Sequence, residues 1–173
     1  LQNSFIIHRD LAARNILLKE EERGKLVVKV SDFGLSRMLS SDQDFYHSQS
    51  SVLPVRWSAP EAISQRLFSH QSDVWSFGVL CWEIFSRGDM PYSELSNQEV
   101  LPFLQSGGRL SRPLDCPDTL YSLMMECWNT APESRPHFKD ILCKVMNFIQ
   151  ISLPSSSAMS PCFDESLALN SHA

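Results

Sequence analysis

The sequence predicts a single, mostly α-helical domain with short β-hairpins, an α+β fold. A length of 173 residues suits one domain, and a hydrophobic fraction of 43% is enough for a sizeable core. Apolar, β-branched stretches occur near the start of the chain, whereas apolar residues at helical spacing dominate after residue 60. We therefore expect the strands first and the helices afterwards.

The first two strands are expected to flank a polar loop. Residues 5–7 and 16–18 are short apolar runs, which predict buried strands. Between them lies the sequence HRDLAARN at residues 8–15. Polar groups held between buried strands are typical of a site on a rigid scaffold.

A predicted hairpin brings two polar side chains together. Its strands are expected at residues 15–19 and 25–31, joined by a charged turn that contains a glycine. Asn15 stands at the start of the first strand, and Asp32 follows the second. Because the two ends of a hairpin lie side by side, we expect Asn15 and Asp32 to converge on one ligand.

The next part of the chain predicts irregular structure. Residues 40–51 are polar and predict a long loop, a kind of segment that is usually functional or mobile. Tyr46 lies in this loop. Prolines at positions 54 and 60 exclude a regular helix before residue 60, where a short helix can begin.

The strongest predicted helix covers residues 72–86. It is apolar on almost all sides and should therefore be buried, with Ser72 as its cap and Gly88 at its end. Asp73 lies in its first turn, where a carboxylate suits the helix dipole but needs partners if it is buried.

Three further helices are expected. Ser96 and Glu99 form a capping box for one that Pro102 should kink or shorten. The others are predicted at residues 118–128 and 137–151. Residues 152–173 are rich in serine and lack a pattern, which predicts a disordered tail.

Composition argues against several classes of protein. Lys and Arg number 15 against 20 Asp and Glu, a net charge of −5, and no basic stripe indicates nucleic-acid binding. No apolar run is long enough for a membrane span. The five cysteines lack metal-ligand spacing and predict reduced, mostly buried thiols in a cytosolic setting.

Several motifs, taken together and in order, resemble the catalytic signature of protein kinases. They are HRDLAARN at 8–15, DFG at 32–34, APE at 59–61, DVWSFG at 73–78, CW at 127–128 and RP at 135–136. Ala12 and Arg14, with PVRW at 54–57, are similar to the tyrosine-specific kinases. The resemblance implies a protein tyrosine kinase catalytic domain over residues 1–151, present as its C-terminal (large) lobe with the N-lobe absent.

The resemblance also implies a reaction, the transfer of the γ-phosphoryl group of Mg·ATP to a tyrosine of a protein substrate. Asp10 would be the catalytic base that accepts the proton of the attacking hydroxyl. Asn15 and Asp32 would bind Mg²⁺ through oxygen atoms, which this ion prefers. Arg14 would contact the substrate hydroxyl or the γ-phosphate of ATP.

Two further groups of residues surround these. Pro54 and Trp57 would belong to the platform that holds the substrate backbone. Tyr46 is predicted to be an autophosphorylation site, because a phosphate there could pair with Arg9, Arg37 or both and order the loop.

Structural roles are implied for three more residues. Glu61 and Arg135 correspond to a buried ion pair of the family. Asp73 would accept hydrogen bonds from the backbone of residues 8–10 and tie the central helix to the site.

Some parts that the family uses are not among these residues, namely the glycine-rich loop, the strand lysine and its glutamate partner. We therefore expect the chain alone neither to bind ATP usefully nor to phosphorylate, and to aggregate. A pseudokinase scaffold and a truncated, non-catalytic binding protein stay open as alternatives. The expected location is the cytoplasm, or the cytoplasmic side of the plasma membrane if the parent is a receptor.

Overall fold

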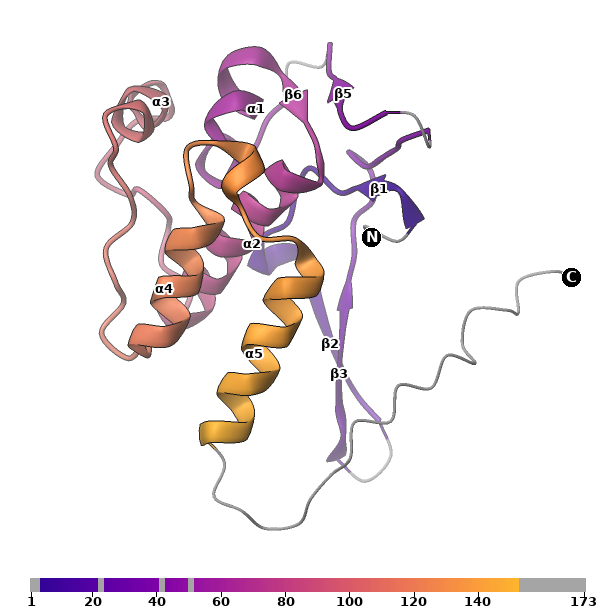
Figure 1. The fold of residues 1–173 in the computed structure, drawn as a ribbon, viewed down its shortest axis with the longest axis vertical. Coiled ribbons are helices and arrows are strands. Elements are labelled where there is room, and N and C mark those ends of the chain that lie inside the picture. Colours follow the sequence, from indigo (N-terminus) through magenta and orange to yellow (C-terminus); the bar gives the residue numbers. More distant parts are fainter. Residues whose placement is uncertain (1–3, 22–23, 41–42, 50–51, 153–173) are drawn as a thin grey trace, which may run out of the picture.

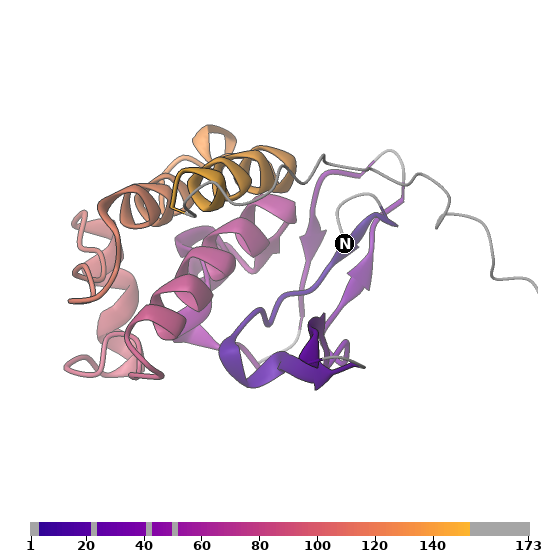
Figure 2. The ribbon, with the colours of Figure 1, turned by 90° about the horizontal axis from the view of Figure 1, so that it is seen from below.

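A computed structural model of the chain describes residues 4–21, 24–40, 43–49 and 52–152. The described part is rich in helices and has short antiparallel strand pairs, as the sequence predicts. Helices occupy one side of the molecule and strands the other, a division visible in two perpendicular views (Figures 1 and 2). The helices are α1 (Pro60–Gln65), α2 (His70–Phe85), α3 (Asn97–Gln105), α4 (Asp118–Cys127) and α5 (Phe138–Ser152).

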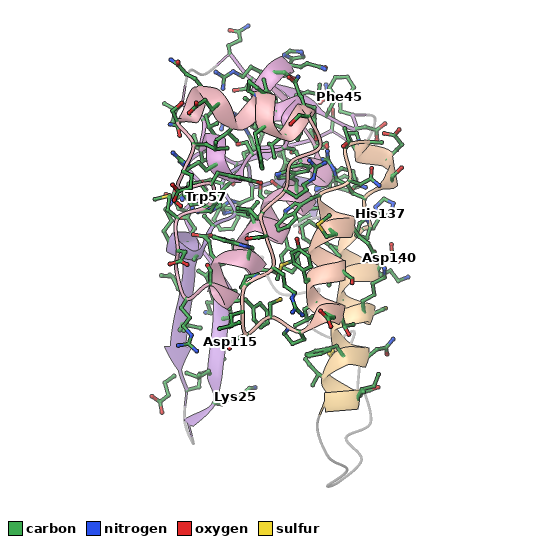
Figure 3. All side chains as sticks on the ribbon, turned by 90° about the vertical axis from the view of Figure 1, so that its left-hand side faces the viewer. Lys25, Phe45, Trp57, Asp115, His137 and Asp140 are labelled. Atoms are coloured by element: carbon green, nitrogen blue, oxygen red, sulfur yellow. The ribbon has the colours of Figure 1, made fainter. Side chains whose placement is uncertain are left out.

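The predicted hairpin is confirmed, but its burial is not. Strand β2 (Ile16–Glu20) pairs antiparallel with β3 (Leu26–Val30), with Ile16 opposite Val30. Leu17 is 55% exposed and Leu18 is 67% exposed, so the prediction of a buried strand at residues 16–18 was wrong. The reason is visible in Figure 3, where the hairpin projects from the body with Lys25 near its far end.

The other strands are only two residues long. Strand β1 (Ile6–Ile7) pairs with β4 (Arg37–Met38), and Ile7 is fully buried. Strand β5 (Tyr46–His47) pairs with β6 (Leu67–Phe68). The expected long loop at residues 40–51 therefore contains a strand, which forms because a partner some twenty residues along the chain lies beside it.

Helix α2 begins two residues before the predicted start. Ser69 is its N-cap, and its Oγ accepts a hydrogen bond from the backbone N–H of Ser72 at 3.2 Å. The Oγ of Ser72 accepts from the backbone N–H of Ser69 at 3.0 Å, so Ser72 completes a capping box instead of opening the helix. At the other end Gly88 has a φ of +93°, and its N–H donates to the carbonyl of Glu83.

The remaining helices follow their predictions to within a residue or two. The backbone N–H of Ser96 donates to Glu99 Oε2 at 2.8 Å at the start of α3, which has only nine residues and contains Pro102. Helix α5 ends at Ser152, and the rest of the predicted tail lies outside the described residues. No helix in the described ranges is long and apolar enough to cross a membrane.

The core forms where α2 packs on α4. Val74, Trp75 and Val79 of α2 are fully buried. Gly78 permits the close approach of the two helices, because an added Cβ would lie 2.6 Å from Nε1 of Trp128, the C-cap residue of α4. Free thiols line this region at Cys81, Cys116 and Cys127, whereas Cys143 is exposed and Cys162 lies outside the described residues.

Candidate active site

The polar loop at residues 8–15 is fixed to the central helix through Asp73. The carboxylate accepts hydrogen bonds from the backbone N–H groups of His8 at 2.7 Å and Arg9 at 2.9 Å. Asp73 is only 1% exposed, and this burial raises its pKa to about 6. Arg9 has a φ of +70°, a strained backbone conformation that these bonds help to hold.

Asp10 is held by two neighbours in its own loop. The side-chain amide of Asn15 donates to the Asp10 carbonyl at 2.8 Å and to its Oδ2 at 2.9 Å. The guanidinium of Arg14 forms an ion pair with Oδ1. Asn15 is buried, whereas the Asp10 side chain keeps an exposed fraction of 14%. The carboxylate is therefore fixed in direction and still reachable from solvent.

Asp32 lies two residues after β3, at the open end of the hairpin, where Asn15 precedes β2. The backbone N–H of Ser31 donates to the Asn15 carbonyl at 2.8 Å, which joins the two strand ends. Asp32 is exposed and has a φ of +58°. Its Oδ1 accepts from the backbone N–H of Gly34 at 3.1 Å. Asn15 thus contacts Asp10 directly and is bonded to Ser31, the residue before Asp32.

Trp57 connects this loop to the segment around Pro54. It ends the short 3₁₀ helix η4 (Val55–Trp57), whose N-cap is Pro54. The Cζ atom of Arg14 lies 4.4 Å from the centre of the Trp57 ring, within range of a cation–π interaction. In Figure 3 Lys25 lies near one end of the hairpin, and Trp57 lies beyond the other end.

Glu83 of α2 is a buried acid that the sequence reasoning missed. Its Oε2 accepts from the backbone N–H of Ala13 at 2.9 Å and from Nε1 of Trp57 at 2.8 Å. Glu83 is 8% exposed. A lone carboxylate inside an apolar helix was the signal that could have revealed it.

Arg56 was also missed. Its guanidinium donates to the carbonyls of Pro91 at 3.0 Å and Leu95 at 2.6 Å, and also to that of Tyr92. These bonds attach η4 to the segment between α2 and α3. Nothing in the sequence could reveal acceptors that are backbone carbonyls some forty residues away.

Two arginines surround Tyr46. The Cζ atoms of Arg9 and Arg37 lie 5.2 Å and 5.6 Å from the centre of its ring. Arg9 also donates to the carbonyl of Leu35 and to Ser48 Oγ, at 2.9 Å and 2.7 Å. Burial, and then the charge of Arg37, lower the pKa of Arg9. Positive charge is thus concentrated around the Tyr46 side chain.

Glu61 and Arg135 form a bidentate ion pair. The guanidinium donates to Glu61 Oε1 at 2.6 Å and to Oε2 at 2.9 Å. The Arg135 side chain is 0% exposed and that of Glu61 is 11% exposed. The pair joins α1 to the segment before α5.

Comparisons with known proteins agree with these observations. The sequence model of a family described as protein tyrosine and serine/threonine kinase matches residues 1–145. Human Ephrin type-A receptor 1 is 50% identical over 141 residues, which are 82% of this chain and 14% of that protein. The mouse protein of the same name is 52% identical over 132 residues, 76% of this chain and 13% of that protein.

A second receptor type gives a longer match. Ephrin type-A receptor 5 of Gallus gallus is 48% identical over 151 residues, 87% of this chain and 14% of that protein. The chain therefore spans only a small part, 13% to 14%, of the length of these relatives.

Proposed function

The chain belongs to the protein tyrosine and serine/threonine kinase family, and from this premise we propose that it is the C-terminal lobe of a protein tyrosine kinase. The reaction is transfer of the γ-phosphoryl group of ATP to the hydroxyl of a tyrosine in a protein. The observation that carries the proposal is the arrangement of Asp10, which Asn15 and Arg14 hold in place at the surface.

Asp10 is the proposed catalytic base. Its carboxylate is fixed on one side by Asn15 and on the other by Arg14, and it remains partly exposed to an incoming hydroxyl. General base catalysis requires such a group within hydrogen-bonding reach of the proton that it accepts.

Asn15 and Asp32 are the proposed Mg²⁺ ligands. Asn15 uses its Nδ2 for Asp10, which leaves Oδ1 as its ligand atom, and Asp32 offers an exposed carboxylate. Among the described residues no cluster of three or more His, Cys, Asp or Glu could hold a metal by itself. The pair of Asn15 and Asp32 suits Mg²⁺, which takes few protein ligands and completes its shell with phosphate and water. Bound Mg²⁺ would neutralise charge on the phosphates of ATP.

Tyrosine is the proposed acceptor because of the residues around Arg14. Ala12 lies two residues before Arg14 in the loop, and the Trp57 ring covers the guanidinium of Arg14. Arg14 would contact the substrate hydroxyl or the γ-phosphate, and Pro54 and Trp57 would carry the substrate backbone. A tyrosine hydroxyl lies farther from its backbone than that of serine, so the platform must hold the backbone farther from Asp10.

The similarity to Ephrin receptors supports a receptor kinase with this part on the cytoplasmic side of the plasma membrane, where ATP is available.

The test requires an N-terminal lobe, because the 173 residues do not contain the glycine-rich loop and lysine of the family. We define the fusion kinase as this chain joined behind the N-terminal lobe of a related tyrosine kinase. It should phosphorylate a tyrosine peptide and leave the matching serine peptide unmodified. The 173-residue chain alone should not bind ATP stoichiometrically in calorimetry.

Two variants separate catalysis from binding. Asp10→Asn should lower kcat of the fusion kinase by about 10²- to 10⁴-fold with little change in KM for ATP. Glu126→Gln is the control, since Glu126 lies on α4 in an exposed pair with Lys144. A folded fusion kinase that transfers no phosphate would instead support the pseudokinase or non-catalytic scaffold alternative.

A further inference from the structure

Glu83 joins two segments that the proposed function assigns to different tasks. One of its oxygens, Oε2, accepts both the backbone N–H of Ala13 at 2.9 Å and the indole N–H of Trp57 at 2.8 Å. Ala13 belongs to the loop that carries Asp10, in the 3₁₀ helix η2 (Ala13–Asn15). A single buried carboxylate on the central helix therefore fixes the loop and the platform relative to each other.

The contacts continue from Trp57 to the catalytic carboxylate. The Arg14 guanidinium lies against the Trp57 ring, 4.4 Å from its centre, and also pairs with Asp10. Glu83, Trp57, Arg14 and Asp10 form an unbroken series of contacts. We call the first three residues of this series the Glu83–Trp57–Arg14 stack.

The stack has a physical reason to act as a unit. The Arg14 side chain is 44% exposed, so without a support it would sample many rotamers. The indole ring supplies that support, and the bond from its N–H to a carboxylate fixes the rotation of the ring. Donation to an anionic acceptor also shifts electron density onto the ring, which strengthens its attraction for the guanidinium.

We propose that Glu83 is a positioning residue, which acts through Trp57 to set Arg14 beside Asp10. This inference rests on the proposed function, because it gives the stack a role in orienting the acceptor hydroxyl. The platform that carries the substrate backbone is then coupled to the catalytic base, so a displacement of the platform also displaces Arg14. Glu83 contributes to the choice of tyrosine over serine in this way.

Kinetics of the fusion kinase test the coupling. Glu83→Gln keeps the size of the side chain and removes its charge. We expect kcat/KM for the tyrosine peptide to fall by about tenfold to a hundredfold, the preference for tyrosine over serine to shrink, and KM for ATP to stay unchanged. A merely structural role would not change acceptor preference at constant KM for ATP. Glu126→Gln is the charge-matched control and should behave like the wild type.

A double-mutant cycle tests the route through Trp57. Trp57→Phe keeps an aromatic ring and loses the indole N–H, without altering the buried acid. If Glu83 acts through Trp57, the loss caused by Glu83→Gln should be clearly smaller in the Trp57→Phe background. Fold-changes that multiply independently, or a Glu83→Gln variant with wild-type kinetics, would overturn the proposal. If Glu83→Gln does not fold, Trp57→Phe alone must lower kcat/KM and acceptor preference, and wild-type values would overturn the proposal.

A readout without catalysis separates this inference from the proposed function. In ¹⁵N NMR of the fusion kinase, the Trp57 indole N–H should exchange with solvent about tenfold faster or more in Glu83→Gln. It should be unchanged in Glu126→Gln. If the wild-type fusion kinase is inactive, the proposed function fails, and the exchange rate still reports whether Glu83 fixes Trp57. Unchanged exchange in Glu83→Gln would overturn the inference even in an active kinase.

Discussion

Single side chains determine where the candidate active site can form. Asp73 accepts hydrogen bonds from the backbone N–H groups of His8 and Arg9. Glu83 accepts one from the backbone N–H of Ala13 and one from the indole N–H of Trp57. Both acids are buried, so each must be hydrogen-bonded to be tolerated. The positions of Asp10 and Asn15 therefore depend on carboxylates of α2 that would themselves not touch a substrate.

The raised pKa of Asp73 makes stability depend on pH. Burial moves this pKa from 3.8 to about 6, so between these values the folded state keeps a proton that the unfolded state has released. The contribution of Asp73 to stability is fully present below its ordinary pKa and is lost as the pH rises through about 6.

Urea denaturation of the fusion kinase can measure this dependence. The free energy of unfolding of the wild type, minus that of Asp73→Asn, should fall as the pH rises from about 4 to about 7. A difference that stays level or rises across this range would contradict the assignment to Asp73.

Tyr46 is proposed as a regulatory site of autophosphorylation. Arg9 and Arg37 already lie against its ring, and a phosphate would form charge-assisted hydrogen bonds with them. Tyr46→Phe retains a ring for both arginines and cannot accept phosphate. We expect this variant to lose the rise in kcat that follows preincubation with Mg·ATP. Equal activation, and equal hydrogen exchange over residues 43–49, would argue against the site.

At the scale of elements, the sequence predicted what depends on local patterns. The hairpin, the helix that begins at Pro60 and the capping box at Ser96 follow from nearby residues and were all placed correctly. Burial was less predictable, because the exposed Leu18 and a buried leucine have the same local sequence signal. The β5–β6 pair and the contacts of Glu83 join segments far apart in the chain, which no local pattern reveals.

The contact between α2 and α4 depends on the absence of a side chain at Gly78. A Cβ there would lie 2.6 Å from Trp128 Nε1 and 3.0 Å from Cys127 Cβ. We expect Gly78→Ala to lower the free energy of unfolding by about 1–3 kcal/mol, measured by chemical denaturation of the fusion kinase. Trp128→Phe removes the indole nitrogen, so the alanine should cost less in that background. An equal cost in both backgrounds would exclude this contact as the cause.

At the scale of the whole molecule, a few polar links join distant parts of the chain. Arg135 reaches Glu61 across 74 residues, and Asp73 reaches His8 across 65. These links surround α2, which contacts strands, 3₁₀ helices and α4 alike. The central helix is thus the element through which the candidate active site and the helical side of the molecule are held together.

Loss of the Glu61–Arg135 pair should destabilise the whole fold. Glu61→Gln leaves a fully buried guanidinium without its anion, which costs about 3–5 kcal/mol. Glu126→Gln breaks an exposed pair with Lys144 and should cost less than about 1 kcal/mol. Thermal unfolding of both variants in the fusion kinase provides the comparison, and similar losses would contradict the role of burial.

The hydrogen bonds between Asp73 and the loop at residues 8–15 also have a consequence for biosynthesis. The ribosome synthesises His8 before Asp73, and 65 residues separate the two in the chain. At about 5–20 residues per second, this interval lasts roughly 3 to 13 seconds. During that time the nascent loop lacks its anchor, so the proposed catalytic base acquires its geometry only after α2 has emerged.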